Sequence, residues 1–189
     1  VYKTRMEELL PSLLDNFMRN ASIIAQMLPY LPESFKTQIE PNVKLYADFF
    51  EKVDSINPFG VNIALSGWAG NRGIIQSSIT NYLLYQHFPE IINPESIYRS
   101  LNYIYGCHPF HSLSFVSGVG AQPKKVAYGN NRADYTFIPG GIVPGIRLLN
   151  PDFPENRDDY PFLWSENEYV IDVAADYIFL VNAVNTLLK

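Results

Sequence analysis

The stretch that decides the fold is Trp164-Ser165-Glu166-Asn167-Glu168-Tyr169-Val170-Ile171-Asp172-Val173-Ala174-Ala175-Asp176, near the C-terminus. Ser165, followed three residues later by Glu168 and then by an apolar run, has the pattern of a capping box. We therefore predict a helix from this box to about Leu188. From Tyr169 onward the helix is apolar almost all the way round, which is typical of a helix inside a packed structure.

Three acids in this predicted helix need an explanation. Glu168, Asp172 and Asp176 are spaced i, i+4 and i+8, so they form one stripe, and like charges at this spacing oppose helix formation by a few tenths of a kcal/mol per pair. Either cations and backbone donors satisfy them, or they face a polar cavity. A capping role for Glu168 and a hydrogen-bonding role for the two aspartates would explain them without catalysis, so the rest of the chain must decide.

Composition excludes several classes of protein. The chain has 189 residues, a net charge of −5 and no basic cluster larger than Lys124-Lys125, which argues against nucleic acid and anionic membrane surfaces as partners. Its single cysteine, Cys107, excludes an intrachain disulfide, and no residues have zinc-ligand spacing. No apolar run is long enough to span a membrane. Because Val1 falls directly into a helical pattern, we expect the chain to be part of a longer one.

The remaining chain predicts helices and one long irregular segment. Helical periodicity covers about residues 2–27, 35–56 and 71–87, and Asn93-Pro94 caps a helix over 94–105 that ends at Gly106. Pro11 must lie in a first turn or divide the first helix. Residues expected on the inward faces include Leu45, Phe49 and Val53 in the second helix and Ile75, Ile79, Tyr82 and Leu83 in the third. Residues 107–161 are rich in glycine and proline, so we predict an all-α fold of about five helices with long irregular loops.

Four segments, in order, resemble motifs of glycoside hydrolase family 9. They are Asn57-Pro58-Phe59-Gly60 with Gly67-Trp68-Ala69-Gly70-Asn71, Leu101-Asn102-Tyr103-Ile104-Tyr105-Gly106 with Phe115-Val116-Ser117-Gly118-Val119-Gly120, Pro139-Gly140-Gly141-Ile142-Val143-Pro144-Gly145, and Asn167-Glu168-Tyr169-Val170-Ile171-Asp172. The likeness covers about residues 57–185, and residues 1–56 match only as helices. It implies part of an (α/α)6 toroid and an inverting hydrolase of β-linked glucans, secreted or periplasmic.

The resemblance also implies catalytic roles. The glutamate of the family's NE motif is its general acid, and here that residue is Glu168. The family's general base is an aspartate in an N-terminal motif that this chain lacks. Residues 1–189 would therefore be the C-terminal portion of one catalytic domain, inactive alone, with the N-terminal half of that domain and a β-glycan as its partners.

The sugar-binding residues follow the family less closely. The family's histidine-rich sugar-contact motif corresponds to Tyr128-Gly129-Asn130-Asn131-Arg132, in which Arg132 carries over and Tyr128 and Asn131 are further candidates. Trp68 is a candidate platform for a pyranose ring, although a loop-anchoring role explains it equally well. Arg132 could instead pair with a surface acid. No cofactor or metal is expected, although the acidic loop at Asp152, Glu155, Asp158 and Asp159 could hold calcium, which some family members bind.

Physical chemistry leaves the acid role of Glu168 open. A general acid must stay protonated, so its pKa must be raised by burial or by a like charge. Asp172 and Glu166 would raise the pKa of Glu168, whereas a first-turn position in a helix would lower it. The alternatives to a hydrolase are a carbohydrate-binding protein that has lost the chemistry and a helical scaffold that shares only the fold.

Overall fold

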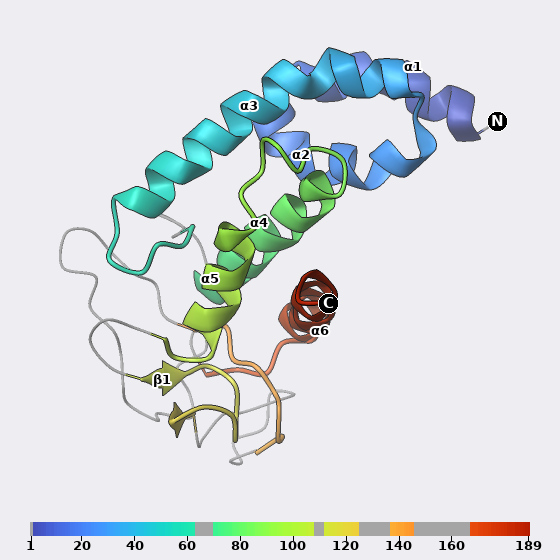
Figure 1. Cartoon of the computed structure of the whole chain (residues 1–189). Coiled ribbons are helices and arrows are strands. Elements are labelled where there is room, and N and C mark those ends of the chain that lie inside the picture. The colour runs from blue at the N-terminus through green and yellow to red at the C-terminus, as the bar shows by residue number, and fades with distance from the viewer. Residues whose placement is uncertain (1, 63–69, 108–111, 125–136, 146–166) are drawn as a thin grey trace.

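The computed structural model describes residues 2–62, 70–107, 112–124, 137–145 and 167–189, and the fold is all-α, as predicted. Figure 1 shows the long helix α3 lying along one edge above α2, with α4, α5 and α6 in the middle and the loops at the opposite end. The elements are α1 (Tyr2–Leu14), α2 (Phe17–Met27), the 3-10 helix η1 (Leu28–Tyr30), α3 (Glu33–Ser55), α4 (Gly70–Tyr85), α5 (Glu95–Ile104), β1 (Leu113–Ser114), β2 (Gln122–Pro123) and α6 (Ile171–Leu187).

The first predicted helix is divided, but not at its proline. Pro11 lies inside α1, and the chain turns at Asp15 and Asn16 before α2 begins. The side-chain amide of Asn20 donates to the carbonyl oxygen of Leu13 at 3.0 Å and ties the two helices together across this turn. The described residues therefore contain six α-helices, one more than expected.

The prediction for the inward face of α3 is wrong. Leu45 and Phe49 are 67% and 50% exposed, whereas the buried stripe consists of Phe35, Ile39, Val43 and Tyr46. Both stripes have helical spacing, so periodicity alone cannot choose between them. The observed stripe is inward because it packs in one core cluster with α1, α2 and the end of α4.

Helix α4 is central, because it packs against α2, α5 and α6. Ile75 is completely buried as predicted, and Ile79, Tyr82 and Leu83 are partly buried. Helix α5 also follows its prediction: the backbone N–H of Glu95 donates to Oδ1 of Asn93 at 3.0 Å. The turn that ends α5 has Gly106 at a φ of +89°, where an added Cβ would lie 2.7 Å from the carbonyl oxygen of Ser112.

The described loops join into a small layer at one end of α4, α5 and α6. Strands β1 and β2 pair in parallel, with Leu113 opposite Gln122. Val116 and Ile142 form an isolated antiparallel bridge, and the N–H of Val143 donates to the carbonyl oxygen of Phe115 at 3.0 Å. A second core cluster continues from these loops into α4, α5 and α6.

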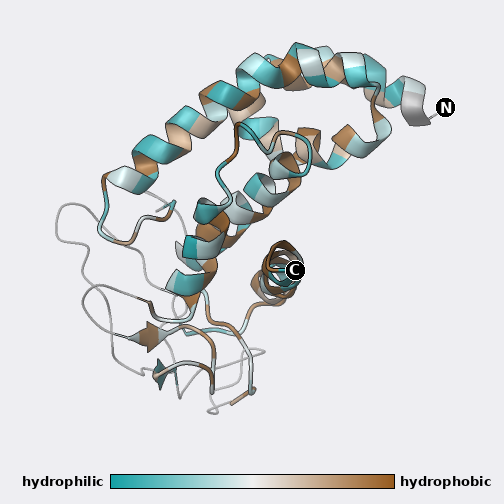
Figure 2. Ribbon diagram, viewed as in Figure 1, coloured by the Kyte–Doolittle hydropathy of each residue, from teal (hydrophilic) through white to brown (hydrophobic). Residues whose placement is uncertain are grey.

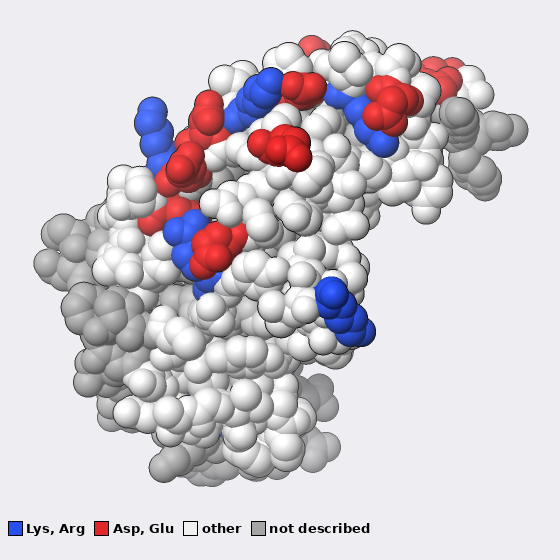
Figure 3. Space-filling model, viewed as in Figure 1, with Lys and Arg blue, Asp and Glu red and all other residues white. Residues whose placement is uncertain are grey.

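Hydropathy and charge differ between parts of the molecule. Figure 2 shows α6 as mainly hydrophobic, while α3 alternates between hydrophilic and hydrophobic residues. On the face seen in Figure 3, charged side chains gather over the helical end with both signs interspersed. Several are ion pairs within one helix, such as Arg5–Glu8 in α1 and Lys44–Glu40 in α3. Among the described residues, no helix is both long and apolar enough to cross a membrane.

Candidate functional site

The start of α4 and the glycine-rich segment at residues 139–145 lie against each other. The side-chain amide of Asn71 donates to the carbonyl oxygen of Val143 at 3.0 Å, and its backbone N–H donates to that of Pro144 at 2.8 Å. Gly145 has a φ of +75°, and an added Cβ there would collide with the Asn71 side-chain amide. Two of the motif segments thus meet across about seventy residues of chain, and glycine is required where they touch.

The same glycine-rich segment also contacts residues 115–117. Gly140 donates its N–H to the carbonyl oxygen of Ser117, and Ser117 donates its own N–H to that of Gly141, both at 2.8 Å. The N–H of Gly141 closes the turn on the carbonyl oxygen of Ile138 at 2.8 Å. The second and third motif segments are therefore held together by backbone hydrogen bonds.

The fourth segment reaches this turn through Tyr169. Its hydroxyl lies 2.7 Å from Oγ of Ser117 and accepts a hydrogen bond from the N–H of Ile138 at 3.1 Å. Its ring covers Gly141, where an added Cβ would lie only 2.6 Å from the ring. Glu168, the predicted general acid, directly precedes this anchored residue. Asn71, Ser117 and Tyr169 were not predicted as site residues, and the signals in the sequence were their places in the family-like segments and the glycines that contact them.

The capping box at the start of α6 is a wrong prediction. The helix begins at Ile171, and Val170 before it is extended, with φ −117° and ψ 127°. Glu168 therefore precedes the helix and does not occupy its first turn. The physical reason is the anchoring of Tyr169, whose hydroxyl contacts with Ser117 and Ile138 hold this residue on the glycine-rich turn, outside the helix.

Neighbouring side chains satisfy the two aspartates of the predicted stripe. Oδ2 of Asp172 lies 3.1 Å from Nη2 of Arg72, and Oδ2 of Asp176 accepts a hydrogen bond from Nε2 of Gln76 at 3.1 Å. Both partners are on α4, so the acids join α6 to α4. Satisfaction by a cation is therefore confirmed for Asp172, whereas Asp176 is bound by a side-chain amide, which is neither a cation nor a backbone donor.

Glu168 lies at a hollow of about 900 Å³ between the start of α6 and the glycine-rich turn. The lining combines apolar surface with two carboxylates and the anchored tyrosine, contributed by Ile138, Gly141, Ile142, Glu168, Tyr169, Val170, Ile171, Asp172, Ala174 and Ala175. Of the two lining carboxylates, Asp172 forms the ion pair with Arg72 described above. The volume of the hollow is large enough for a sugar unit.

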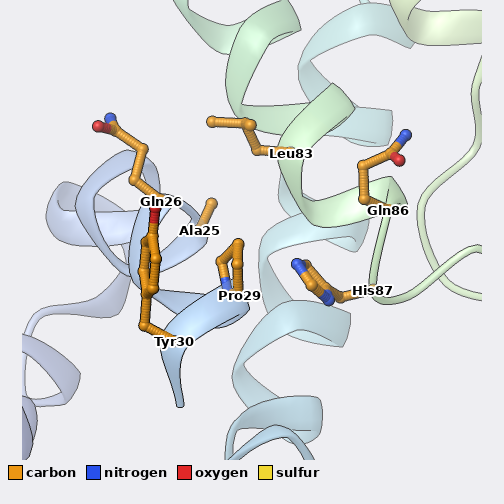
Figure 4. A pocket seen from close by; sticks show the side chains of 7 residues that line it. All are labelled: Ala25, Gln26, Pro29, Tyr30, Leu83, Gln86 and His87. Atoms are coloured by element: carbon orange, nitrogen blue, oxygen red, sulfur yellow. The ribbon is translucent and has the colours of Figure 1, made fainter. Parts of the chain in front are cut away.

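A second hollow, of about 570 Å³, lies between α2, η1 and the end of α4. Figure 4 shows the ring of Tyr30 on one side and His87 on the other, with Pro29 between them. Burial, assisted by nearby Lys36, lowers the pKa of His87. The other lining residues are Ala25, Gln26, Leu83 and Gln86, so this lining contains no carboxylate that could act as a general acid.

Asp54 is the one acid among the described residues that is buried, with 7% of its surface exposed. Burial raises its pKa to about 6, and Arg99 on α5, with Nη2 3.7 Å from Oδ2, opposes that rise. The adjoining cavity is only about 100 Å³ and too small for a sugar. Asp54 therefore joins α3 to α5 and is no candidate for the reacting centre.

The predicted sugar-binding residues Trp68, Tyr128, Asn131 and Arg132 lie outside the described residues, as do Ser165, Glu166 and the acidic loop at Asp152, Glu155, Asp158 and Asp159. Within the described ranges, no group of three or more His, Cys, Asp or Glu side chains could hold a metal ion.

Two solved structures share the fold. The structure of AaCel9A in complex with cellobiose-like isofagomine matches with a TM-score of 0.60 and 16% identity, over 81% of this chain and 32% of that chain. A single mutant of a thermostable endoglucanase from Alicyclobacillus acidocaldarius matches with a TM-score of 0.61 and 16% identity, over 80% of this chain and 32% of that chain. No family model matches the chain, and neither does any curated protein. The chain spans about a third of the solved structures it matches, and its resemblance to glycoside hydrolase family 9 is confirmed at the level of the fold.

Proposed function

We propose that this chain is the C-terminal portion of the catalytic domain of an inverting β-glucan hydrolase, with Glu168 as its general acid. The observation that carries this proposal is the position of Glu168. It lines the hollow of about 900 Å³, beside the turn where the family-like segments meet, in a fold shared with endoglucanases. The alternative acid in that lining, Asp172, is bound to Arg72.

The proposed chemistry needs two carboxyl groups on opposite sides of the glycosidic bond. Glu168 protonates the oxygen of the leaving sugar, while a carboxylate roughly 6.5–9.5 Å away removes a proton from the attacking water. The second carboxylate is an aspartate of the N-terminal half of the domain. Proton transfer between carboxyl groups, sugar and water requires no cofactor, so a calcium ion in the acidic loop would have a structural role only.

Sugar binding is assigned from the family resemblance to Trp68, Tyr128, Asn131 and Arg132, which lie outside the described residues. Trp68 offers an indole face to the apolar side of a pyranose, and Arg132 donates to sugar hydroxyls. Tyr128 and Asn131 add neutral hydrogen-bonding groups that suit an uncharged ligand. A polymeric glucan is met outside the cell, so the proposed location is secreted or periplasmic.

The exposed surface of α6 supports a covering partner. Ile171 and Ile178 lie on one side of α6, seven residues apart, and are 89% and 62% exposed, with Phe179 beside them. Clustered apolar side chains on a helix surface indicate an interaction site. We assign the N-terminal half of the same domain to this site, because the chain corresponds to only about a third of the structures that share its fold.

The test is hydrolysis by the full-length protein on a panel of soluble β-glucans, with Glu168→Gln beside the parent. Loss of general acid catalysis should lower kcat by about 10²–10⁴-fold. Glu95→Gln is the matched control, because Glu95 is an exposed glutamate in α5, far from the hollow in sequence. A Glu168→Gln variant as active as its parent would overturn the assignment.

A carbohydrate-binding protein without activity is the second candidate. It is favoured by the sugar-contact segment at residues 128–132, in which only Arg132 carries over from the family's histidine-rich motif. Retention of the parent protein on an immobilised β-glucan, without release of reducing sugar, would support it. A protein that neither binds nor cleaves any glycan would leave a scaffold role.

A further inference from the structure

Tyr169 is held at three points. Its hydroxyl contacts Ser117 Oγ and the N–H of Ile138, and its ring covers Gly141. The phenol oxygen accepts from the N–H of Ile138, and in its contact with Ser117 either hydroxyl can be the donor. Few rotations of the ring can preserve all three contacts, so Tyr169 has one defined position on the glycine-rich turn.

This position also determines where Glu168 lies. One peptide unit joins Glu168 to Tyr169, and that unit is planar, so anchoring the tyrosine restricts the path of the backbone before it. The turn that holds Tyr169 also supplies Ile138 and Gly141 to the lining of the same hollow. Tyr169 therefore fixes the position of Glu168 relative to the turn that lines the same hollow.

We propose that Tyr169 is a positioning residue for the general acid: through its hydroxyl contacts with Ser117 and Ile138, it holds Glu168 at the oxygen of the leaving sugar. This inference depends on the proposed function of Glu168. It adds a residue whose part in the reaction is geometric, because a displacement of about 1 Å in a reacting group can lower a rate about 100-fold.

Tyr169→Phe removes the hydroxyl and keeps the ring over Gly141. Tyr177→Phe is the matched control, since Tyr177 is also on the α6 segment and its hydroxyl lies 2.9 Å from the hydroxyl of Tyr105. Both variants lose a tyrosine hydroxyl contact, but only Tyr169 adjoins Glu168. Thermal unfolding of the full-length proteins measures any shared effect on stability.

Two substrates separate positioning of the acid from general damage. The leaving sugar of a β-glucan is a poor leaving group and must be protonated as the bond breaks. In an aryl β-cellobioside the leaving group is a dinitrophenolate, which departs without a proton. In the second reaction, water still attacks the anomeric carbon and the base takes its proton. We expect Tyr169→Phe to lower kcat on β-glucan by about 10-fold or more and to change kcat on the aryl substrate less than 3-fold.

The control variants distinguish failure of the positioning role of Tyr169 from failure of the proposed function of Glu168. Tyr177→Phe should leave the ratio of the two activities at the parent value, and Glu168→Gln should show the same selective loss as Tyr169→Phe, but larger. If Glu168→Gln is selective while Tyr169→Phe affects both substrates equally or neither, the positioning role is overturned and the proposed function stands. If Glu168→Gln is as active as its parent on both substrates, the proposed function itself fails.

Discussion

Arg72 on α4 and Asp172 on α6 lie with Nη2 and Oδ2 3.1 Å apart, and one turn further along both helices Gln76 bonds to Asp176. The two contacts keep the same spacing on each helix. They fix the register of α6 against α4 at the end where Glu168 enters the hollow. Polar contacts therefore set the alignment of a helix pair whose packing is mainly apolar.

The ion pair should contribute little to stability despite its geometry. Both side chains are nearly half exposed, so we expect a coupling free energy of about 0.2–1 kcal/mol between Arg72→Met and Asp172→Asn. Urea unfolding of the two single variants and the double variant measures it. Because exposed charges are screened, the coupling should shrink at 1 M salt. A coupling above about 2 kcal/mol that salt does not change would contradict this description.

Asp54 should make the protein less stable as pH rises from about 4 to about 6. Burial raises its folded pKa from the ordinary 3.8 to about 6, so across this interval the folded state holds a proton that the unfolded state has released. Stability is then highest below pH 4 as far as this group is concerned, and it falls until pH passes 6. The fall should be on the order of 2–3 kcal/mol at most, because one pKa unit corresponds to about 1.4 kcal/mol.

The matched variants for this prediction are both on α3. Asp54→Asn should remove the slope between pH 4 and 6, since an amide does not titrate there. Asp48→Asn, at an exposed position of the same helix, should retain it. Urea unfolding at half-unit pH intervals gives the slope. Equal slopes for the parent and Asp54→Asn would show that Asp54 is not its source.

Gly141→Ala should disturb the site more than Gly140→Ala. Gly140 has a φ of +77° and open space around it, so alanine there meets only backbone strain of about 1–2 kcal/mol. Alanine at Gly141 would lie 2.6 Å from the ring of Tyr169 and 2.9 Å from the carbonyl oxygen of Ile138, so one of them must move. We expect about 1–3 kcal/mol of destabilisation from this crowding and a loss of glucan hydrolysis that Gly140→Ala does not match. Thermal unfolding and activity assays check both.

The isolated chain should self-associate through α6. Ile178→Glu places a charge on its exposed apolar side and should shift the sedimentation profile toward a 21.5 kDa monomer. Asn102→Glu adds the same charge at an exposed polar position of another helix, α5, and should leave association unchanged. A parent chain that sediments as one monomeric species would contradict the covering partner proposed for this surface.

The positions of the helices could be predicted from the sequence, but the buried side of each helix could be predicted only in part. Asn93 and Gly106 delimited α5 because capping and left-handed backbone are local chemistry. In α3, two stripes competed, and the choice between Leu45 or Phe49 and Ile39 or Val43 depended on neighbouring helices. The start of α6 was misplaced for a related reason: Ser165 and Glu168 have capping spacing, but the anchoring of Tyr169 is a contact with distant residues.

The candidate site was predictable as a set of segments and less so as a set of contacts. The order of the family-like segments and their residue types predicted that Glu168 and the glycine-rich segments belong to one site. The structure brings those of these segments that it describes into one layer. The partners of Asp172 and Asp176 could not be read from spacing, because they lie on another helix. Trp68, Tyr128, Asn131 and Arg132 remain predictions.

The hydrogen bond from Asn71 to Val143 joins residues 72 apart in the chain, and the contact between Ser117 and Tyr169 joins residues 52 apart. Bringing such distant segments together reduces chain entropy before the contact itself forms. The packed helices already hold the ends of each segment close together, so the loss of chain entropy is offset by helix packing. Substitutions that loosen the packing of the helices should therefore disrupt the hollow around Glu168 early, even when the substituted residue does not contact substrate.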